Sequence, residues 1–195
     1  MNHLTISSSE TSEESFDSLD FSRQDLSKKT FLDCNFNRCN FTEALWQNSQ
    51  FSNCTFSHCN ISLAKLEGCR LQDVQFHDCK IVGIDFFRCD SIFFSCKFIR
   101  SLLQYCNFSD LLMKRALFEG SSLKECHFTN TNLVEARFRE TELAGTIFHN
   151  CDLSKADFTT ASTYNIDPQS NKIKKTKFSL PEAVSLLRSF DIILS

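Results

Sequence analysis

The ten residues Cys34-Asn35-Phe36-Asn37-Arg38-Cys39-Asn40-Phe41-Thr42-Glu43 contain the same five-residue unit twice. In each copy a cysteine stands two positions before a phenylalanine, and polar residues fill the other three positions. A period of five matches neither the 3.6-residue period of an amphipathic helix nor the two-residue period of a half-buried strand. The unit therefore predicts a repeat architecture.

Large apolar residues continue this period in both directions, in two registers that differ by two residues. The first register consists of Phe16, Phe21, Leu26, Phe31, Phe36, Phe41, Trp46, Phe51, Phe56, Ile61, Leu66, Leu71, Phe76, Ile81 and Phe86. The second consists of Phe93, Phe98, Leu103, Phe108, Met113, Phe118, Leu123, Phe128, Leu133, Phe138, Leu143, Phe148, Leu153 and Phe158. Together they hold 17 of the 21 phenylalanines, so the role of phenylalanine in this chain is mainly structural.

The position two residues before each large residue is nearly always small from Cys34 onward: Cys, Ala, Ser or Thr. Ten of the eleven cysteines occupy it: Cys34, Cys39, Cys54, Cys59, Cys69, Cys79, Cys96, Cys106, Cys126 and Cys151. The eleventh, Cys89, stands two residues before Ser91, where the first register would continue. We interpret them as small core residues. Their spacing is that of the repeat rather than the two to four intervening residues of zinc ligands, so no metal or other cofactor is expected. An odd number of cysteines without an export signal also argues against a disulfide framework.

These two columns predict an all-β solenoid whose coil has four sides of five residues each. Each side sends one large and one small residue inward, and the same side recurs twenty residues later, about 4.8 Å further along. Phe98, Phe118, Phe138 and Phe158 should then form one ladder. Backbone hydrogen bonds between successive coils would satisfy the main chain, although the sequence has only 4 glycines and 2 prolines for turns.

The unit resembles the consensus of the pentapeptide-repeat family, to which Ala156-Asp157-Phe158-Thr159-Thr160 also conforms. The resemblance extends over residues 16–163 and implies a right-handed quadrilateral β-helix. With 29 units at four per coil, we expect about seven coils and a rod about 35 Å long.

Three segments depart from the repeat. Residues 1–15 are polar and acidic and are expected to be a disordered lead. Residues 87–92 hold a two-residue slip in register, which predicts a bulge or kink near the middle of the rod. In the C-terminal segment, residues 164–195, Ser179 opens a capping box with Pro181 in the first turn, which predicts a short α-helix of about ten residues.

Apolar side chains of this C-terminal segment are the candidate dimer interface. They are Leu180, Val184, Leu187, Phe190, Ile192 and Ile193, and they offer more apolar surface than the end of one solenoid can cover. The segment either caps the last coil only or also pairs two rods end to end about a twofold axis. We favour the second interpretation, a homodimer.

Composition argues against several classes of protein. A net charge of -3 is unsuited to binding nucleic acid by neutralising phosphates. No apolar run approaches the roughly 18 residues of a membrane span, so we expect a cytoplasmic protein without membrane contact. The five histidines form no triad pattern, no glycine-rich phosphate loop exists, and a filled solenoid offers no substrate pocket. No catalytic residues are predicted, and an enzyme is not expected.

Both ends of the repeat region resemble particular members of the family. Phe21-Ser22-Arg23-Gln24-Asp25-Leu26-Ser27 resembles the opening of the Qnr quinolone-resistance proteins. Tyr164-Asn165-Ile166-Asp167-Pro168 and Phe178-Ser179-Leu180-Pro181-Glu182-Ala183-Val184-Ser185-Leu186-Leu187 resemble the ending of albicidin-immunity and microcin-immunity proteins.

This resemblance implies a dimeric rod that imitates the DNA duplex, binds DNA gyrase or topoisomerase IV and protects it from a drug or toxin of the quinolone, albicidin or microcin type. It does not identify the residues that contact gyrase. The alternative, from the repeat alone, is a structural or adaptor rod for another protein partner.

Overall fold

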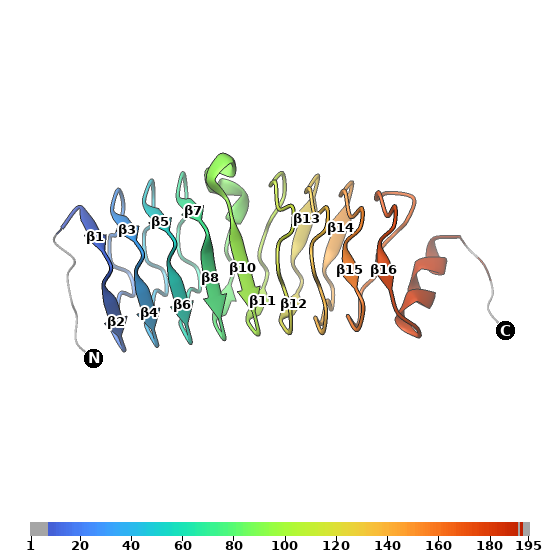
Figure 1. The fold of residues 1–195 in the computed structure, drawn as a ribbon, viewed down its shortest axis with the longest axis horizontal. Coiled ribbons are helices and arrows are strands. Elements are labelled where there is room, and N and C mark those ends of the chain that lie inside the picture. Colours follow the sequence, from blue (N-terminus) through green and yellow to red (C-terminus); the bar gives the residue numbers. More distant parts are fainter. Residues whose placement is uncertain (1–7, 191, 193–195) are drawn as a thin grey trace.

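The computed structural model describes residues 8–190 and 192, which form one straight rod (Figure 1). Short strands and three 3₁₀ helices follow one another along the chain. They are β1 (Glu10–Ser12), β2 (Ser15–Asp17), β3 (Thr30–Leu32), β4 (Asn35–Asn37), β5 (Gln50–Ser52), β6 (Thr55–Ser57), β7 (Arg70–Gln72), β8 (Val74–His77), β9 (Lys80–Val82), η1 (Phe86–Arg88), η2 (Ser91–Phe93), β10 (Cys96–Ile99), β11 (Leu102–Gln104), β12 (Ser122–Lys124), β13 (His127–Thr129), β14 (Ile147–His149), β15 (Asp157–Phe158), β16 (Lys177–Phe178) and η3 (Glu182–Phe190).

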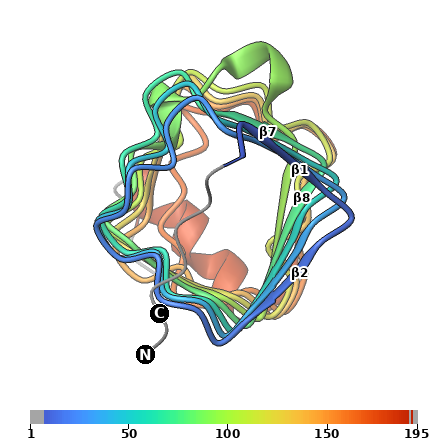
Figure 2. The same ribbon diagram turned by 90° about the vertical axis from the view of Figure 1, so that its left-hand side faces the viewer.

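Every strand pairing is parallel and joins residues one coil apart. Phe31 lies opposite Phe51, and Phe36 lies opposite Phe56, so the coil has twenty residues. The longest sheets have the strand orders β1-β3-β5-β7 and β10-β8-β6-β4-β2. Viewed down the rod, the coil is four-sided (Figure 2). The predicted solenoid is confirmed, with about eight turns instead of about seven.

A continuous stack of nine phenylalanines runs through the core. Ring centroids of successive members lie 4.5 to 5.4 Å apart. The members are Phe16, Phe36, Phe56, Phe76, Phe98, Phe118, Phe138, Phe158 and Phe178. The predicted ladder is thus confirmed and is longer than predicted. Because stacked rings contribute roughly 0.5–1.5 kcal/mol per pair beyond the area they bury, this column stabilises the whole length of the rod.

Many residues at the small inward position are not only small but also donate a hydrogen bond to the main chain. All eleven cysteines are buried free thiols. Cys59 Sγ lies 3.3 Å from the carbonyl oxygen of Phe36, one coil earlier. Thr141 Oγ1 donates to Phe118 O in the same way at 2.7 Å. The interchange of Cys, Ser and Thr in this column follows from this bond, because each is small and each carries a donor.

The corners use left-handed backbone without depending on glycine. The second residue after each large one commonly has a φ between 47° and 68°, as at Arg38, Asn53 and Glu125. All four glycines occupy the same kind of corner. At Gly68 a Cβ would lie 2.4 Å from the side-chain oxygen of Asn48 on the neighbouring coil, so a larger residue there would require the Asn48 side chain to move.

The register slip forms a protrusion, as predicted, made of η1 and η2. The Asp90 carboxylate accepts a hydrogen bond from the backbone N–H of Ile92 at 3.2 Å and caps η2. The extra residues are accommodated on the outside, and the inward position passes to Phe94, which is buried. The prediction that Phe93 starts the second register was wrong: Phe93 is 37% exposed.

The coil extends beyond both predicted ends. Residues 10–15 are not a disordered lead, because β1 and β2 pair with β3 and β4. The polar Thr11 is tolerated in the first coil, which has a neighbour on one side only. Residues 1–7 lie outside the described residues.

The other predicted boundary, after residue 163, also falls inside the coil. Asp157 pairs with Lys177, and Asn171 takes a small inward position, where its side-chain nitrogen donates to Phe148 O at 2.9 Å. The interruption of the five-residue unit near Pro168 hides the continuing twenty-residue period from the sequence.

The C-terminal helix η3 is of the 3₁₀ type, whereas the sequence predicted an α-helix. Ser179 does not act as the predicted side-chain cap, because its Oγ accepts the backbone N–H of Thr160 on the preceding coil at 3.1 Å. The first turn is closed instead by main-chain bonds such as Val184 N–H to Pro181 O, at 3.1 Å. Leu186 packs against the core and holds η3 on the end of the rod.

Candidate functional site

The interior of the rod is filled by core side chains, so recognition falls to its outer surface. Among residues 8–190 and 192, no group of three or more His, Cys, Asp and Glu side chains is placed to hold a metal ion. The same residues contain no helix long and apolar enough to cross a membrane. Three features of the outer surface stand out, at the C-terminal end, along one side, and in the middle.

The C-terminal helix exposes a row of apolar side chains. In a 3₁₀ helix, side chains three residues apart lie directly above one another, so Val184, Leu187 and Phe190 share one face of η3. They are 42%, 37% and 49% exposed. Leu180, on the approach to η3, is exposed too.

The structure brings only some of the predicted interface residues together. Val184, Leu187 and Ile192 line one hollow of about 220 Å³, whereas Leu180 and Phe190 lie outside it. Ile193 is not among the described residues. The five described members are all exposed, and their role as a dimer interface stays a prediction.

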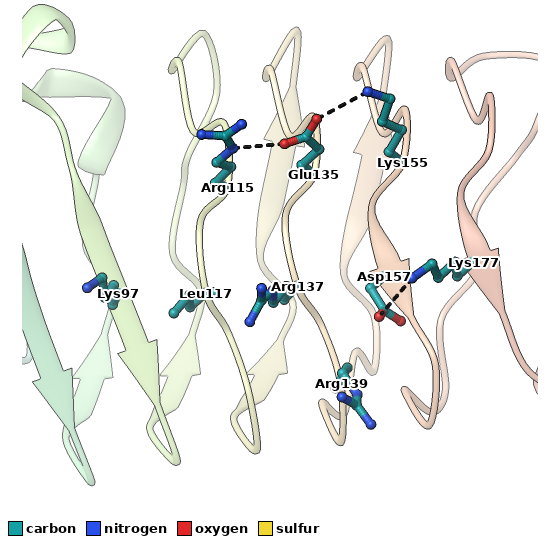
Figure 3. A pocket seen from close by; sticks show the side chains of 9 residues that line it. All are labelled: Lys97, Arg115, Leu117, Glu135, Arg137, Arg139, Lys155, Asp157 and Lys177. Atoms are coloured by element: carbon teal, nitrogen blue, oxygen red, sulfur yellow. Dashed lines mark hydrogen bonds and ion pairs between the residues drawn. The ribbon is translucent and has the colours of Figure 1, made fainter.

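A basic groove of about 560 Å³ runs along one side of the C-terminal half (Figure 3). Nine residues line it: Lys97, Arg115, Leu117, Glu135, Arg137, Arg139, Lys155, Asp157 and Lys177. Six are basic and two are acidic, so the lining carries a formal charge of +4. Most belong to two columns, one along the side itself and one along its corner (Figure 3).

Ion pairs between successive coils organise these charges. Glu135 lies between Arg115, at 2.8 Å, and Lys155, at 3.3 Å. The hydrogen bond from Arg115, followed by that from Lys155, lowers the pKa of the Glu135 carboxyl below its usual value. Lys177 Nζ lies 4.0 Å from an Asp157 oxygen. Glu135 therefore remains ionised and holds two cations along the corner.

Sequence reasoning missed this groove, because its members are far apart in the chain. Read at an interval of twenty, however, Arg115, Glu135 and Lys155 form one series. Once the coil length is known, each residue's neighbours on the surface are found twenty positions away, or 22 across the slip.

The protrusion exposes apolar side chains at the middle of the rod. We call Phe87, Ile92 and Phe93 the mid-rod knob; they are 39%, 82% and 37% exposed. Arg70 and Arg88 brace it, with guanidinium carbons 4.8 Å and 5.2 Å from the ring centres of Phe93 and Phe87.

Comparisons with known proteins match this architecture. The family profile described as "Pentapeptide repeat region" matches residues 29–108, and that described as "Pentapeptide repeats (8 copies)" matches residues 121–159. No curated protein sequence matches the chain.

Solved structures share the fold at low sequence identity. A trypsin-treated variant of QnrB1, a plasmid-mediated fluoroquinolone resistance protein, is 20% identical with a TM-score of 0.61, covering 95% of this chain and 90% of that one. HetL, a pentapeptide repeat protein involved in heterocyst differentiation regulation from the cyanobacterium Nostoc sp. strain PCC 7120, is 16% identical with a TM-score of 0.52, covering 86% and 84%. With two profiles over most of the coil and the same solenoid in both structures, the chain belongs to the pentapeptide-repeat family.

Proposed function

We propose that the protein is a non-catalytic factor that binds DNA gyrase or topoisomerase IV and protects the enzyme from a drug or toxin of the quinolone, albicidin or microcin type. The observation that carries the proposal is the agreement of the fold with that of a fluoroquinolone resistance protein over 95% of the chain. The sequence resemblance of residues 21–27 and of the C-terminal segment to resistance and immunity proteins points the same way.

A binding role also suits the physical design. The core is filled with aromatic rings: Trp46 and fourteen phenylalanines are less than 2% exposed. Such a rod presents fixed columns of side chains at intervals of about 4.8 Å, which is suited to an extended partner. The proposal places the protein in the bacterial cytoplasm, where gyrase acts.

We further propose that two copies pair through η3. The exposed row of Val184, Leu187 and Phe190 is apolar, and a twofold axis through it would cover the same patch on both copies. Eight steps separate Phe16 from Phe178 in the phenylalanine stack, or about 40 Å at the strand spacing. The paired rods would therefore be about 80 Å long, plus the junction.

DNA mimicry in this dimer requires acidic surface, which the two halves of the rod do not share equally. Residues 8–90 contain 13 acidic and 8 basic residues, whereas residues 91–178 contain 9 acidic and 12 basic ones. The N-terminal half is thus the part whose charge suits a DNA-binding partner.

An adaptor role for another protein is the second candidate. HetL, which has the same solenoid, is described as acting in the regulation of heterocyst differentiation, so the fold alone is compatible with other functions.

A supercoiling assay separates the two candidates. Purified gyrase is incubated with relaxed plasmid and an inhibiting concentration of a quinolone or of albicidin, with increasing amounts of the protein. We expect supercoiling to be restored by the wild type and restored less by Leu187→Glu, which should break the dimer. A parallel decatenation assay tests topoisomerase IV. Absence of rescue for both enzymes with both drug classes, together with no binding to either enzyme, would reject the topoisomerase proposal in favour of an adaptor role.

A further inference from the structure

We propose that the mid-rod knob and the basic groove form one docking surface for an acidic segment of a partner protein that carries an apolar anchor residue. The inference stands apart from the topoisomerase proposal, because it defines the partner by its chemistry only. It rests on three observations: exposed apolar side chains, a groove of positive charge, and a hollow that joins the exposed Leu112 to that groove.

The apolar part is exposed and is tied to the coil at its base. Ile92, at 82% exposure, lies next to Phe93, and Leu112 on the following coil is 66% exposed. An ion pair between Arg70 and Asp90, at 3.3 Å, ties the base of the protrusion to the preceding coil. Apolar side chains presented on a braced support are suited to contact an apolar residue of a partner, because little conformational entropy is lost on binding.

The apolar and basic parts are continuous. A small hollow of about 80 Å³ is lined by Phe94, Leu112 and Met113 on one side and by Lys97 and Arg115 on the other. Lys97 and Arg115 also line the basic groove. Phe94 directly follows the knob residue Phe93 in the chain. A chain segment anchored at Leu112 therefore lies beside the row that Figure 3 shows from Lys97 to Lys177.

The spacing of the charges indicates what kind of segment fits. Lys97, Arg137 and Lys177 stand in one column two coils apart, which is about 9.6 Å between neighbours at the strand spacing. In the polyproline II conformation three residues complete one turn and span about 9.3 Å, so every third side chain lies on the same face. A segment in this conformation lying along the rod would thus place an acidic side chain at every third position opposite these cations.

The same surface is less suited to nucleic acid. Glu135 and Asp157 lie among the cations and would face a phosphate backbone. The exposed side chains of Ile92 and Leu112 are apolar and have no hydrogen-bond donor for a phosphate. A protein segment, by contrast, can carry donors and apolar groups at the matching places.

Fluorescence anisotropy with defined probes tests the proposal. The probe is a short labelled peptide with one leucine followed by glutamate at every third position and serine between. One comparison peptide has lysine in place of glutamate. The other has the same composition as the first probe, with its glutamates placed next to one another. A short labelled DNA duplex is the nucleic-acid probe.

We expect the first peptide to bind saturably with a Kd below about 1 mM, and both comparison peptides to bind more weakly. The double variant Lys97→Glu with Arg137→Glu should weaken binding at least about tenfold. Ile92→Ser with Leu112→Ser should weaken it several-fold without changing its salt dependence. Lys28→Glu with Lys65→Glu, which makes the same change of net charge on the N-terminal half, is the matched control and should have little effect.

All substituted side chains are outside the core, and unchanged thermal unfolding will verify that each variant is folded. Three results would overturn the proposal. They are no saturable binding of the acidic peptide, equal loss in the control double variant, and tighter binding of the DNA duplex that the groove variant abolishes. The last would reassign the groove to nucleic acid.

Discussion

Replacing Phe128 by alanine is the most direct test of the packing that holds this rod together. Phe128 is fully buried on the side of the coil that also carries Trp46. Its ring stacks on Phe108 and Phe148, with centroids at 4.9 Å and 5.1 Å, and meets Phe118 edge-on at 5.7 Å. The substitution removes these ring contacts and leaves a void between two coils.

The expected cost follows from these contacts. Phenylalanine buries roughly 100 Å² more apolar surface than alanine, which amounts to about 2.5 kcal/mol at 25 cal/mol per Å². Ring contacts at about 0.5 kcal/mol or more each add roughly 2 kcal/mol. We therefore expect the free energy of unfolding to fall by about 4–5 kcal/mol, within the range seen when buried phenylalanines are truncated.

Urea unfolding followed by far-UV circular dichroism and by the fluorescence of Trp46, the single tryptophan, measures this cost. Phe93→Ala removes the same atoms from an exposed site and serves as the control, with an expected cost of about 1 kcal/mol or less. Trp46 lies four coils from Phe128, so a joint shift of both signals would show that the rod unfolds as one unit. A loss below about 1 kcal/mol, or one equal to that of Phe93→Ala, would refute the assigned core.

Three further predictions concern the thiols and the C-terminal end. Burial raises the pKa of Cys54 and of Cys69 to about 12. The stabilisation from each thiol is complete below its ordinary pKa near 9. As the pH rises from about 9 toward 12, the free energy of unfolding falls by roughly 1.4 kcal/mol per pH unit for each thiol. Urea unfolding in reductant at pH 7 and pH 10 should show this loss, and Cys69→Ala should reduce it; equal stability at both pH values would contradict the prediction. Thiol reagents should label native protein slowly and denatured protein at once, because all eleven thiols are buried; fast native labelling of most of them would contradict the fold. Leu187→Glu should convert dimers to folded monomers in sedimentation velocity, and a wild type that is already monomeric at micromolar concentration would disprove the dimer.

The coil could be predicted from the sequence because its period is unusual and its inward positions accept few residue types. A large residue every five positions, with Cys, Ala, Ser or Thr two positions before it, is compatible with few structures other than a four-sided solenoid. The sequence also located the slip, since Phe86 and Phe93 are seven residues apart. It did not show that Phe94 would replace Phe93 inside, because the five-residue pattern does not reveal the 3₁₀ turn η2 that precedes Phe94.

Both ends of the coil were harder to predict for a related reason. At an end, a coil packs against one neighbour only, so a polar residue such as Thr11 can stand where the interior demands a large apolar one. At the other end, Asn171 replaces a cysteine by supplying an equivalent donor to Phe148 O. The pattern in the sequence is thus weakest where the packing requirement is weakest.

The outer surface could not be predicted from neighbouring residues, because its neighbours are twenty positions apart. Lys155 is adjacent to Glu135 in space and distant from it in the chain. The basic groove therefore becomes visible only when the charged residues after the slip are compared at intervals of twenty. The predicted interface at η3 was accessible earlier, since its apolar residues are close together in the sequence.

The uneven charge of the two halves has a consequence for any dimer joined at η3. Because the C-terminal ends would meet, the basic halves would lie at the centre of the long rod and the acidic halves at its two tips. A partner that normally holds DNA would then be contacted by the tips, where residues 8–90 carry an excess of five negative charges. An acidic segment would be drawn to the centre, where the basic grooves of both copies lie. This charge separation weakens DNA mimicry along the full rod. It would also give the dimer two kinds of contact surface, acidic tips and a basic centre, and each would bind a different part of the partner.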